Sequence, residues 1–165
     1  MKPEPYLNEN DIRRVISIYG DTVYKIAFSY CKNYADADDI YQDVFTKYFQ
    51  NSKPFESNNH EKAWLIRVTI NFSKSFLRSS WHKRMLPLTE DQAEAVYMED
   101  SNDLLETVLS LPIKYREVIH LYYYEGYSTN EIAAILNRRE TTIRTQLQRG
   151  RDRLRLALKE GLSYE

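Results

Sequence analysis

Two adjacent segments near the C-terminal end have side chains that could read the edges of DNA bases. The first begins with Ser128 and Glu131, whose spacing matches a helix-capping box, and ends at Asn137, which tolerates a left-handed turn. The second is rich in arginine, and residues 138–159 hold eight basic side chains against two acidic ones. A capped helix, a short turn and a basic helix in this order predict a DNA-binding helix-turn-helix.

The arginine-rich helix has an apolar face and a polar face when about 100° of rotation is allowed for each residue. The stripe predicted to pack inward holds Ile143, Leu147, Gly150, Leu154 and Leu158. The candidate residues for contact with duplex DNA point away from this stripe and are Thr141, Arg144, Thr145, Gln148 and Arg149. A solvated amphipathic helix is the alternative interpretation of the charge, but the preceding capped helix and turn favour DNA.

A second basic segment, residues 60–84, combines an aromatic side chain, an amide and cations along one helical stripe. The stripe holds Trp64, Arg67, Asn71, Lys74, Ser75 and Arg78. Cations can hold phosphates, an aromatic ring can stack on a base and an amide can read a base edge, so the combination suits unstacked DNA. Trp64 is interpreted equally well as a partly buried core residue.

An acidic helix is predicted over residues 36–48. Its apolar residues share one face, and the opposite face holds Asp39, Gln42 and Asp43. Exposed acidic faces commonly serve only solvation, so these residues by themselves leave open whether this face binds a partner.

Composition and charge predict an all-α protein with two small helical domains. The 165 residues include four glycines and five prolines, and helical periodicity is frequent. Residues 87–112 contain seven acidic residues and no lysine or arginine, which indicates a flexible acidic linker. We therefore predict a first domain over residues 10–85, a linker over residues 86–103 and a helix-turn-helix domain over residues 104–162.

The sequence disfavours several classes of protein. No apolar run approaches the roughly 18 residues of a membrane span and no signal sequence leads the chain, so we expect a soluble, cytoplasmic protein without membrane insertion. Cys31 is the single cysteine and the three histidines are irregularly spaced, which argues against a metal site or another cofactor. Without a glycine-rich phosphate loop or an activated nucleophile, an enzyme is the least favoured class.

The order of these segments resembles the extracytoplasmic-function group of the sigma-70 family, the sigma factors of bacterial RNA polymerase. The resemblance rests on residues 36–45, 63–71, 111–119 and 131–149. It implies that Asp39, Gln42 and Asp43 bind the clamp helices of the largest subunit of core RNA polymerase. It also implies that residues 52–59 and 64–84 melt and hold the minus-ten promoter element, and that the helix-turn-helix reads the minus-thirty-five element.

The resemblance further implies a path for the linker and a set of partners. The acidic linker would run through the polymerase toward the RNA exit path. Core RNA polymerase and promoter DNA, both as duplex and as melted single strand, are the implied partners. An anti-sigma factor is a further candidate partner, whose identity the sequence does not specify.

Some positions depart from the family pattern. Ser75 stands where an acidic or amide residue is frequent, and Gln146 stands where arginine is common. Arg138 and Arg139 replace small capping residues, which makes Thr141 the predicted cap of the second helix. The resemblance places the changes at Arg138, Arg139 and Gln146 near the DNA. The base sequence of the minus-thirty-five element is therefore not carried over from relatives.

Two other functions remain open. A conventional helix-turn-helix regulator would bind duplex DNA as a dimer, but it would leave the stripe from Trp64 to Arg78 and the acidic helix without a role. A non-catalytic helical scaffold would use its basic faces only as soluble surface. Association with core polymerase distinguishes a sigma factor from the regulator, and promoter binding distinguishes it from the scaffold.

Overall fold

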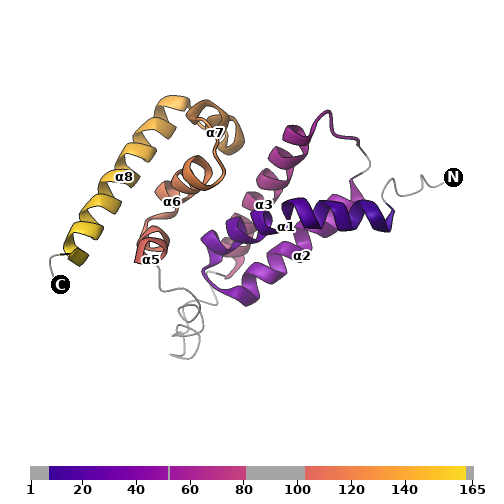
Figure 1. Cartoon of the computed structure of the whole chain (residues 1–165), viewed down its shortest axis with the longest axis horizontal. Coiled ribbons are helices and arrows are strands. Elements are labelled where there is room, and N and C mark those ends of the chain that lie inside the picture. The colour runs from indigo at the N-terminus through magenta and orange to yellow at the C-terminus, as the bar shows by residue number, and fades with distance from the viewer. Residues whose placement is uncertain (1–7, 52, 81–102, 163–165) are drawn as a thin grey trace. The chain divides into compact units, whose positions relative to one another are not determined.

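The computed structural model describes residues 8–51, 53–80 and 103–162, and in these residues all regular structure is helical (Figure 1). The chain separates into two compact units, Met1–Pro87 and Leu88–Glu165. The predicted linker over residues 86–103 lies outside the described residues, except for Asp103, which begins a helix. The all-α fold class predicted from the sequence is confirmed.

The first unit is a bundle of three helices in which each helix packs against the other two. They are α1 (Glu9–Cys31), α2 (Tyr34–Gln50) and α3 (Asn58–Ser80). Asn8 begins α1 in a capping box with Asp11, and Asn33 begins α2 by accepting a hydrogen bond from the Asp36 amide at 2.8 Å. Lys32 has a left-handed backbone, with φ at 60°, which ends α1 and turns the chain toward α2.

The core of the first unit consists of aliphatic side chains surrounded by aromatic ones. The most deeply buried aliphatic residues include Val15, Val23, Ile40, Val44 and Leu65. Partly buried aromatic side chains pack against this core, among them Phe55, Trp64, Phe72 and Phe76. Burying an aliphatic side chain contributes roughly 1.5–3 kcal/mol, so this core determines which faces of α2 and α3 are turned to solvent.

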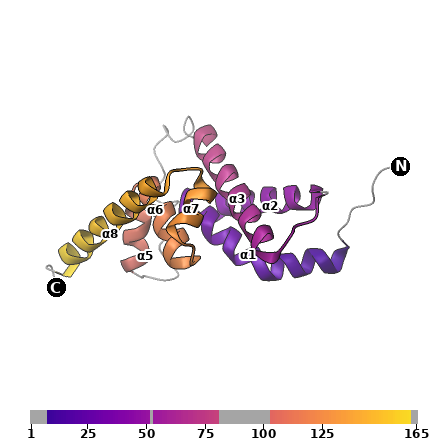
Figure 2. The ribbon, with the colours of Figure 1, turned by 90° about the horizontal axis from the view of Figure 1, so that it is seen from above.

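The second unit arranges short helical segments beside one long helix (Figures 1 and 2). The short segments are α5 (Asp103–Ser110), α6 (Ile113–Ile119), η2 (His120–Tyr124) and α7 (Thr129–Leu136), and the long helix is α8 (Glu140–Leu162). The segment η2 is a π-helical turn, in which the Glu125 amide donates to the carbonyl of His120, five residues earlier, at 3.2 Å. Helices α5, α6 and α7 all contact α8 and so form the unit around it.

Helices α6 and α8 approach each other closely at Gly150. A β-carbon at this position would lie 3.0 Å from Cγ1 of Ile119, which is tighter than ordinary packing. Ile143 and Leu147 are buried, as predicted, and Leu154 is half-buried. Leu158 is 36% exposed, so the predicted inward stripe is wrong at its last position, because α8 is exposed on all sides from residue 155 to residue 160.

Candidate nucleic-acid and polymerase interfaces

The helix-turn-helix consists of α7, α8 and the short turn between them. The Ser128 hydroxyl accepts a hydrogen bond from the Glu131 amide at 3.2 Å, and the Ser128 amide donates to the Glu131 carboxylate at 3.1 Å. Asn137 ends α7 with a left-handed backbone, with φ at 53°. The capping box and the left-handed turn predicted from the sequence are therefore confirmed.

Helix α8 begins at Glu140, one residue before the predicted cap. The prediction that Thr141 caps this helix is wrong, because Thr141 lies within its first turn. The Glu140 carboxylate accepts hydrogen bonds from the Thr129 hydroxyl at 3.0 Å and from Nη2 of Arg144 at 2.8 Å. The helix dipole stabilises a carboxylate in this position, and the contact with Thr129 joins the start of α8 to the start of α7.

The outward face of α8 brings together four of the five side chains predicted to contact duplex DNA. These exposed residues are Thr141, Arg144, Thr145 and Gln148. The Thr145 hydroxyl donates to the Thr141 carbonyl at 3.0 Å, and Nε2 of Gln148 donates to the Asp152 carboxylate at 3.1 Å. Both partners lie within α8, so base edges can replace these contacts without disturbing the packing of the unit.

Arg149, the fifth of these side chains, lies against α6 instead. Its guanidinium forms a hydrogen bond with the Tyr115 hydroxyl, and the Arg153 guanidinium lies 5.1 Å from the centre of the Tyr115 ring. Burial raises the pKa of the Tyr115 hydroxyl, but the hydrogen bond with Arg149 and the charges of Lys114 and Arg153 outweigh it, so that the net pKa is lowered. Arg149 is exposed and lies one helical turn after Thr145, but its guanidinium is directed toward Tyr115 of α6.

Helix α8 also contacts η2 through Arg151, a contact that the sequence did not predict. Nε of Arg151 donates a hydrogen bond to the Tyr123 hydroxyl at 2.6 Å. The guanidinium lies 5.4 Å from the centre of the Tyr122 ring and 5.5 Å from that of Tyr123. Such cation–π contacts contribute roughly 0.5–1 kcal/mol at exposed sites. The sequence feature that could have indicated this contact is the run of three tyrosines at residues 122–124, which precedes an arginine-rich helix.

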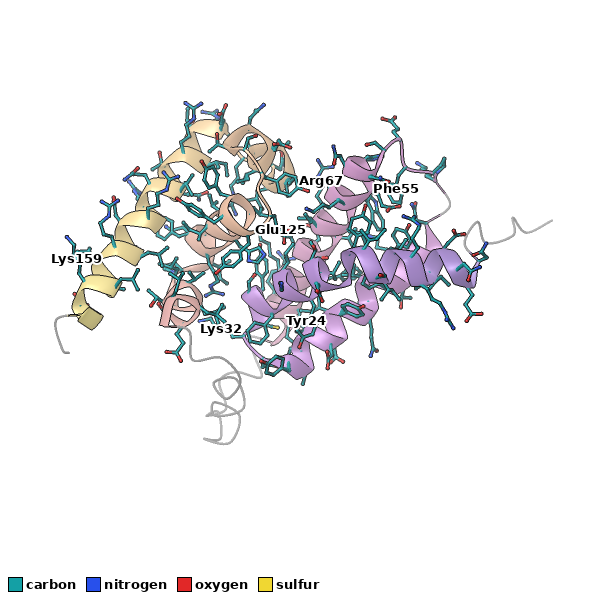
Figure 3. All side chains as sticks on the ribbon, viewed as in Figure 1. Tyr24, Lys32, Phe55, Arg67, Glu125 and Lys159 are labelled. Atoms are coloured by element: carbon teal, nitrogen blue, oxygen red, sulfur yellow. The ribbon has the colours of Figure 1, made fainter. Side chains whose placement is uncertain are left out.

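The polar stripe of α3 is exposed at most of its positions. The exposed members are Arg67, which is labelled in Figure 3, Asn71, Ser75 and Arg78. Lys74 and Trp64 are half-buried, and the Trp64 ring packs edge-on against Tyr48 with 6.0 Å between the ring centres. Trp64 therefore contributes to the core with part of its surface, while the amide and the cations form a row along the helix.

The loop that precedes α3 is held by Phe55 and His60. The Phe55 ring lies 5.5 Å from the Trp64 ring and 5.3 Å from the His60 ring (Figure 3). Nδ1 of His60 accepts a hydrogen bond from the Glu56 amide at 3.1 Å. The segment 52–59 assigned to this loop is too long by two residues, because Asn58 and Asn59 already belong to α3, and Ser52 lies outside the described residues. The remaining loop residues, 53–57, are held in place by Phe55, whose ring packs against the ring of Trp64.

The acidic face of α2 is turned to solvent, as predicted. Asp39, Gln42 and Asp43 are all exposed, whereas Ile40 and Val44 on the opposite side are at most 1% exposed. Two carboxylates and an amide on one exposed helical surface provide acceptors for a basic partner surface.

The described residues contain neither a candidate metal site nor a helix that could span a membrane. In residues 8–51, 53–80 and 103–162 no group of three or more histidine, cysteine, aspartate or glutamate side chains is placed to hold a metal ion. Across the same ranges, none of the helices has both the length and the apolar character of a membrane span. The cations, amides and aromatic rings of α3 and α8 are side chains of the kinds that contact phosphates and bases in nucleic-acid-binding proteins.

Two family models match this chain, one in each unit. Residues 15–83 match the model of sigma-70 region 2, and residues 101–154 match the model of sigma-70, region 4. The first range includes the acidic face of α2 and the polar stripe of α3. The second includes α7, the turn and α8 as far as Leu154, so every face described above lies within a matched range.

Named relatives and a solved structure agree with these models. The chain is 29% identical to the ECF RNA polymerase sigma factor SigW of Bacillus subtilis (strain 168), with 88% of each chain covered. It is 31% identical to the RNA polymerase sigma factor SigV of the same organism, with 85% of this chain and 87% of SigV covered. The sigma factor RpoE from Bartonella quintana, solved in complex with the anti-sigma factor NepR, superimposes with a TM-score of 0.71 at 25% identity, covering 91% of this chain and 98% of RpoE. The chain therefore belongs to the extracytoplasmic-function group of the sigma-70 family, the sigma factors that bind core RNA polymerase and direct it to promoters.

Proposed function

We propose that three faces of the protein perform three separate steps of transcription initiation. The outward face of α8 reads the minus-thirty-five element in the major groove. The polar stripe of α3, with the loop before it, opens and holds the minus-ten element. The acidic face of α2 binds the clamp helices of the largest polymerase subunit. The protein performs these steps in the cytoplasm, and it supplies binding energy and positioning rather than a catalytic group.

The exposed side chains at the start of α8 are the observation that best supports this proposal. In helix-turn-helix proteins the N-terminal part of the second helix reaches the base edges. Thr141, Arg144, Thr145 and Gln148 occupy that part of α8, and their described partners all lie nearby on the same helix. Arg149, which is bonded to Tyr115, is assigned to the DNA backbone, where a cation positions the protein without reading sequence.

The polar stripe of α3 is suited to an unstacked strand. Asn71 lies two helical turns from Trp64, and Arg67 and Lys74 lie on either side of Asn71 along the helix. A base extruded from the stack can meet the Asn71 amide while its flanking phosphates meet the two cations, and Arg78 extends the cationic row. The exposed part of the Trp64 ring provides a stacking surface at the beginning of the stripe.

The remaining assignments concern the linker and regulation. The acidic linker over residues 86–103 runs through the polymerase toward the RNA exit path, where its charge imitates nucleic acid. An anti-sigma factor is a further proposed partner, because the structurally similar RpoE was solved bound to one.

Photocrosslinking in the assembled complex tests the three assignments together. A photoreactive amino acid is placed at Thr46 on α2, Ser75 on α3 or Thr142 on α8, all of which are exposed. Each variant is assembled with core polymerase on one promoter. We expect Thr46 to crosslink the largest subunit, Ser75 the melted minus-ten strand and Thr142 the minus-thirty-five duplex. The same probe at exposed Lys25 on α1 is the control for non-specific reaction.

The crosslinks also distinguish the proposed function from that of a conventional helix-turn-helix regulator. A conventional helix-turn-helix regulator would crosslink duplex DNA from Thr142 in the absence of polymerase, and would give no crosslink to polymerase from Thr46. That pattern, or a Ser75 probe that reacts only with protein, would contradict the proposed division of functions.

A further inference from the structure

Three segments of the second unit meet at the side chain of Arg138. One arm of its guanidinium donates to the carboxylate of Glu117 on α6, and Nη1 donates to Oε1 of Gln146 on α8 at 3.1 Å. Arg138 itself lies in the turn between α7 and α8, and its amide donates to the Ala133 carbonyl at 3.0 Å. One side chain thus joins α6, the turn and α8.

Because Glu117 is buried, its contact with Arg138 strongly constrains the position of the turn between α7 and α8. Its side chain is 2% exposed, and a carboxylate removed from water requires hydrogen bonds and an opposite charge. Arginine can supply both and can reach a second acceptor with its other arm, because its donors lie in a planar fork. The position of the turn is therefore coupled to that of α6, the helix on which α8 packs at Gly150.

We propose that Arg138 is a positioning residue that sets where α8 sits relative to the bases of the upstream element. It contacts no base itself. By holding the turn and Gln146 near Glu117, Arg138 sets how deeply α8 enters the major groove and how it is rotated there. That depth and rotation place Arg144 and Gln148 at the base edges. This inference rests on the proposed function of α8 as the reader of the minus-thirty-five element.

The contact with Gln146 suggests a matched rescue. Because the end of the Gln146 side chain reaches the Arg138 guanidinium, an arginine at residue 146 can bring its own guanidinium to the same place. The variant Arg138→Gln with Gln146→Arg therefore returns a cation to Glu117, but from α8 instead of from the turn. Arg139→Gln is the charge control, because Arg139 is an exposed neighbour in the same turn.

The test is a selection from a promoter library in which each base of the upstream element is varied. Holoenzymes containing the parent, Arg138→Gln, Arg138→Gln with Gln146→Arg, and Arg139→Gln are compared at one salt concentration. The measured quantity is the ratio of binding between preferred and other bases at each position. Partial unfolding lowers the active fraction equally for all sequences, so it leaves these ratios unchanged, whereas a displaced helix changes them.

We expect Arg138→Gln to lower the preference for at least one base by about tenfold, within the range of a lost bidentate contact. The double variant should restore the parental ratios, and Arg139→Gln should keep them even if it weakens all sequences. If Arg138→Gln fails to fold, Arg138→Lys takes its place with the same expectation, since lysine keeps the charge but lacks the fork.

The outcomes separate this inference from the proposed function. A parent holoenzyme without any base preference in the upstream element would contradict the proposed function of α8. A parental preference that is unchanged in the Arg138 variant, or that the double variant does not restore, would overturn the role of Arg138 alone.

Discussion

The Tyr48 hydroxyl donates a hydrogen bond to Oε2 of Glu61 at 3.0 Å and so joins α2 to the first turn of α3. Glu61 is 6% exposed, and Nη2 of Arg14 on α1 lies 3.7 Å from the same oxygen. One buried carboxylate therefore contacts side chains of both other helices in the first unit. This contact holds the beginning of α3, where the row of polar side chains starts.

We expect the first unit to lose stability as the pH rises above the ordinary tyrosine pKa of 10.0. Burial, followed by the charge and hydrogen bond of Glu61, raises the pKa of Tyr48. The folded state then keeps a proton that the unfolded chain releases. This contribution to the free energy of unfolding is complete below pH 10.0 and is lost as the pH rises toward the folded-state pKa.

Thermal unfolding followed by tryptophan fluorescence between about pH 8 and about pH 11 measures this effect. Every protein in this comparison also carries Trp81→Phe, so the signal comes from Trp64, which packs against the core of the first unit. Tyr48→Phe should flatten the alkaline fall in melting temperature, whereas Tyr124→Phe, at an exposed position of the second unit, should not. An equally steep fall in Tyr48→Phe and in the parent would contradict the prediction.

Charge reversal on the acidic face of α2 should abolish binding to core polymerase. Asp39→Lys with Asp43→Lys replaces two exposed carboxylates by cations, so the helical content should remain parental while a basic partner surface is repelled. Competition with labelled parent protein for core polymerase at fixed salt measures the effect. Asp21→Lys with Asp38→Lys makes the same change of charge at other exposed positions and should compete as the parent does. Undiminished competition by the first variant would show that this face is not the polymerase interface.

Two arginines of α8 should behave differently when replaced. Arg144→Ala should relax base selection at one upstream position, because a bidentate contact with guanine provides about 1–3 kcal/mol of discrimination. Arg149→Ala should weaken all upstream sequences alike and reduce the dependence of binding on salt, because a phosphate contact has no base preference. Selection from an upstream-base library at two salt concentrations measures both effects. If Arg144→Ala retains the parental selectivity, direct reading by Arg144 is rejected.

Asn71→Ala should reduce strand opening while leaving core binding and upstream contacts nearly intact. Loss of one contact between an amide and a base should cost about 1–3 kcal/mol. Permanganate reactivity of thymines around the start site measures opening on a supercoiled promoter, and the same promoter with a premelted bubble should largely rescue the defect. Asn10→Ala, which removes an exposed amide of α1 outside the stripe, is the control and should open the promoter as the parent does. Trp64→Ala is a poorer probe, because truncating a large aromatic residue that packs on the core costs about 3–5 kcal/mol. Equal opening by Asn71→Ala and the parent on the closed template would refute the assignment.

Local rules were sufficient to predict most of the helix-turn-helix. Ser128 and Asn137 act on backbone groups within a few residues, so their roles are visible in the sequence. The predicted cap at Thr141 failed because Glu140 is held by Thr129, eleven residues earlier, and no local rule includes that contact. The periodicity of α8 identified Ile143 correctly but not Leu158, because a helical period describes a face and not how far a neighbouring helix covers it.

Side-chain contacts between helices could not be predicted from the sequence. The pair Tyr48 and Glu61 and the pair Arg151 and Tyr123 each join residues of separate elements, and nothing in their spacing distinguishes them from other tyrosines and charges. Trp64 shows the same difficulty, because the stripe of α3 predicts its position on the helix but not its contact with Tyr48. The packing of whole elements determines these contacts.

The π-helical turn at His120–Tyr124 contains one residue more than an α-helix uses to complete a turn. Deleting a single residue there would return the segment to α-helical form and leave the flanking residues in nearly the same orientation, because the π-helical turn accommodates the extra residue. The tyrosines within the turn would shift by one position, so a different side chain would face Arg151. Homologues are therefore best compared here by the length of the segment between α6 and α7, since one insertion or deletion there changes which side chain faces Arg151 on α8.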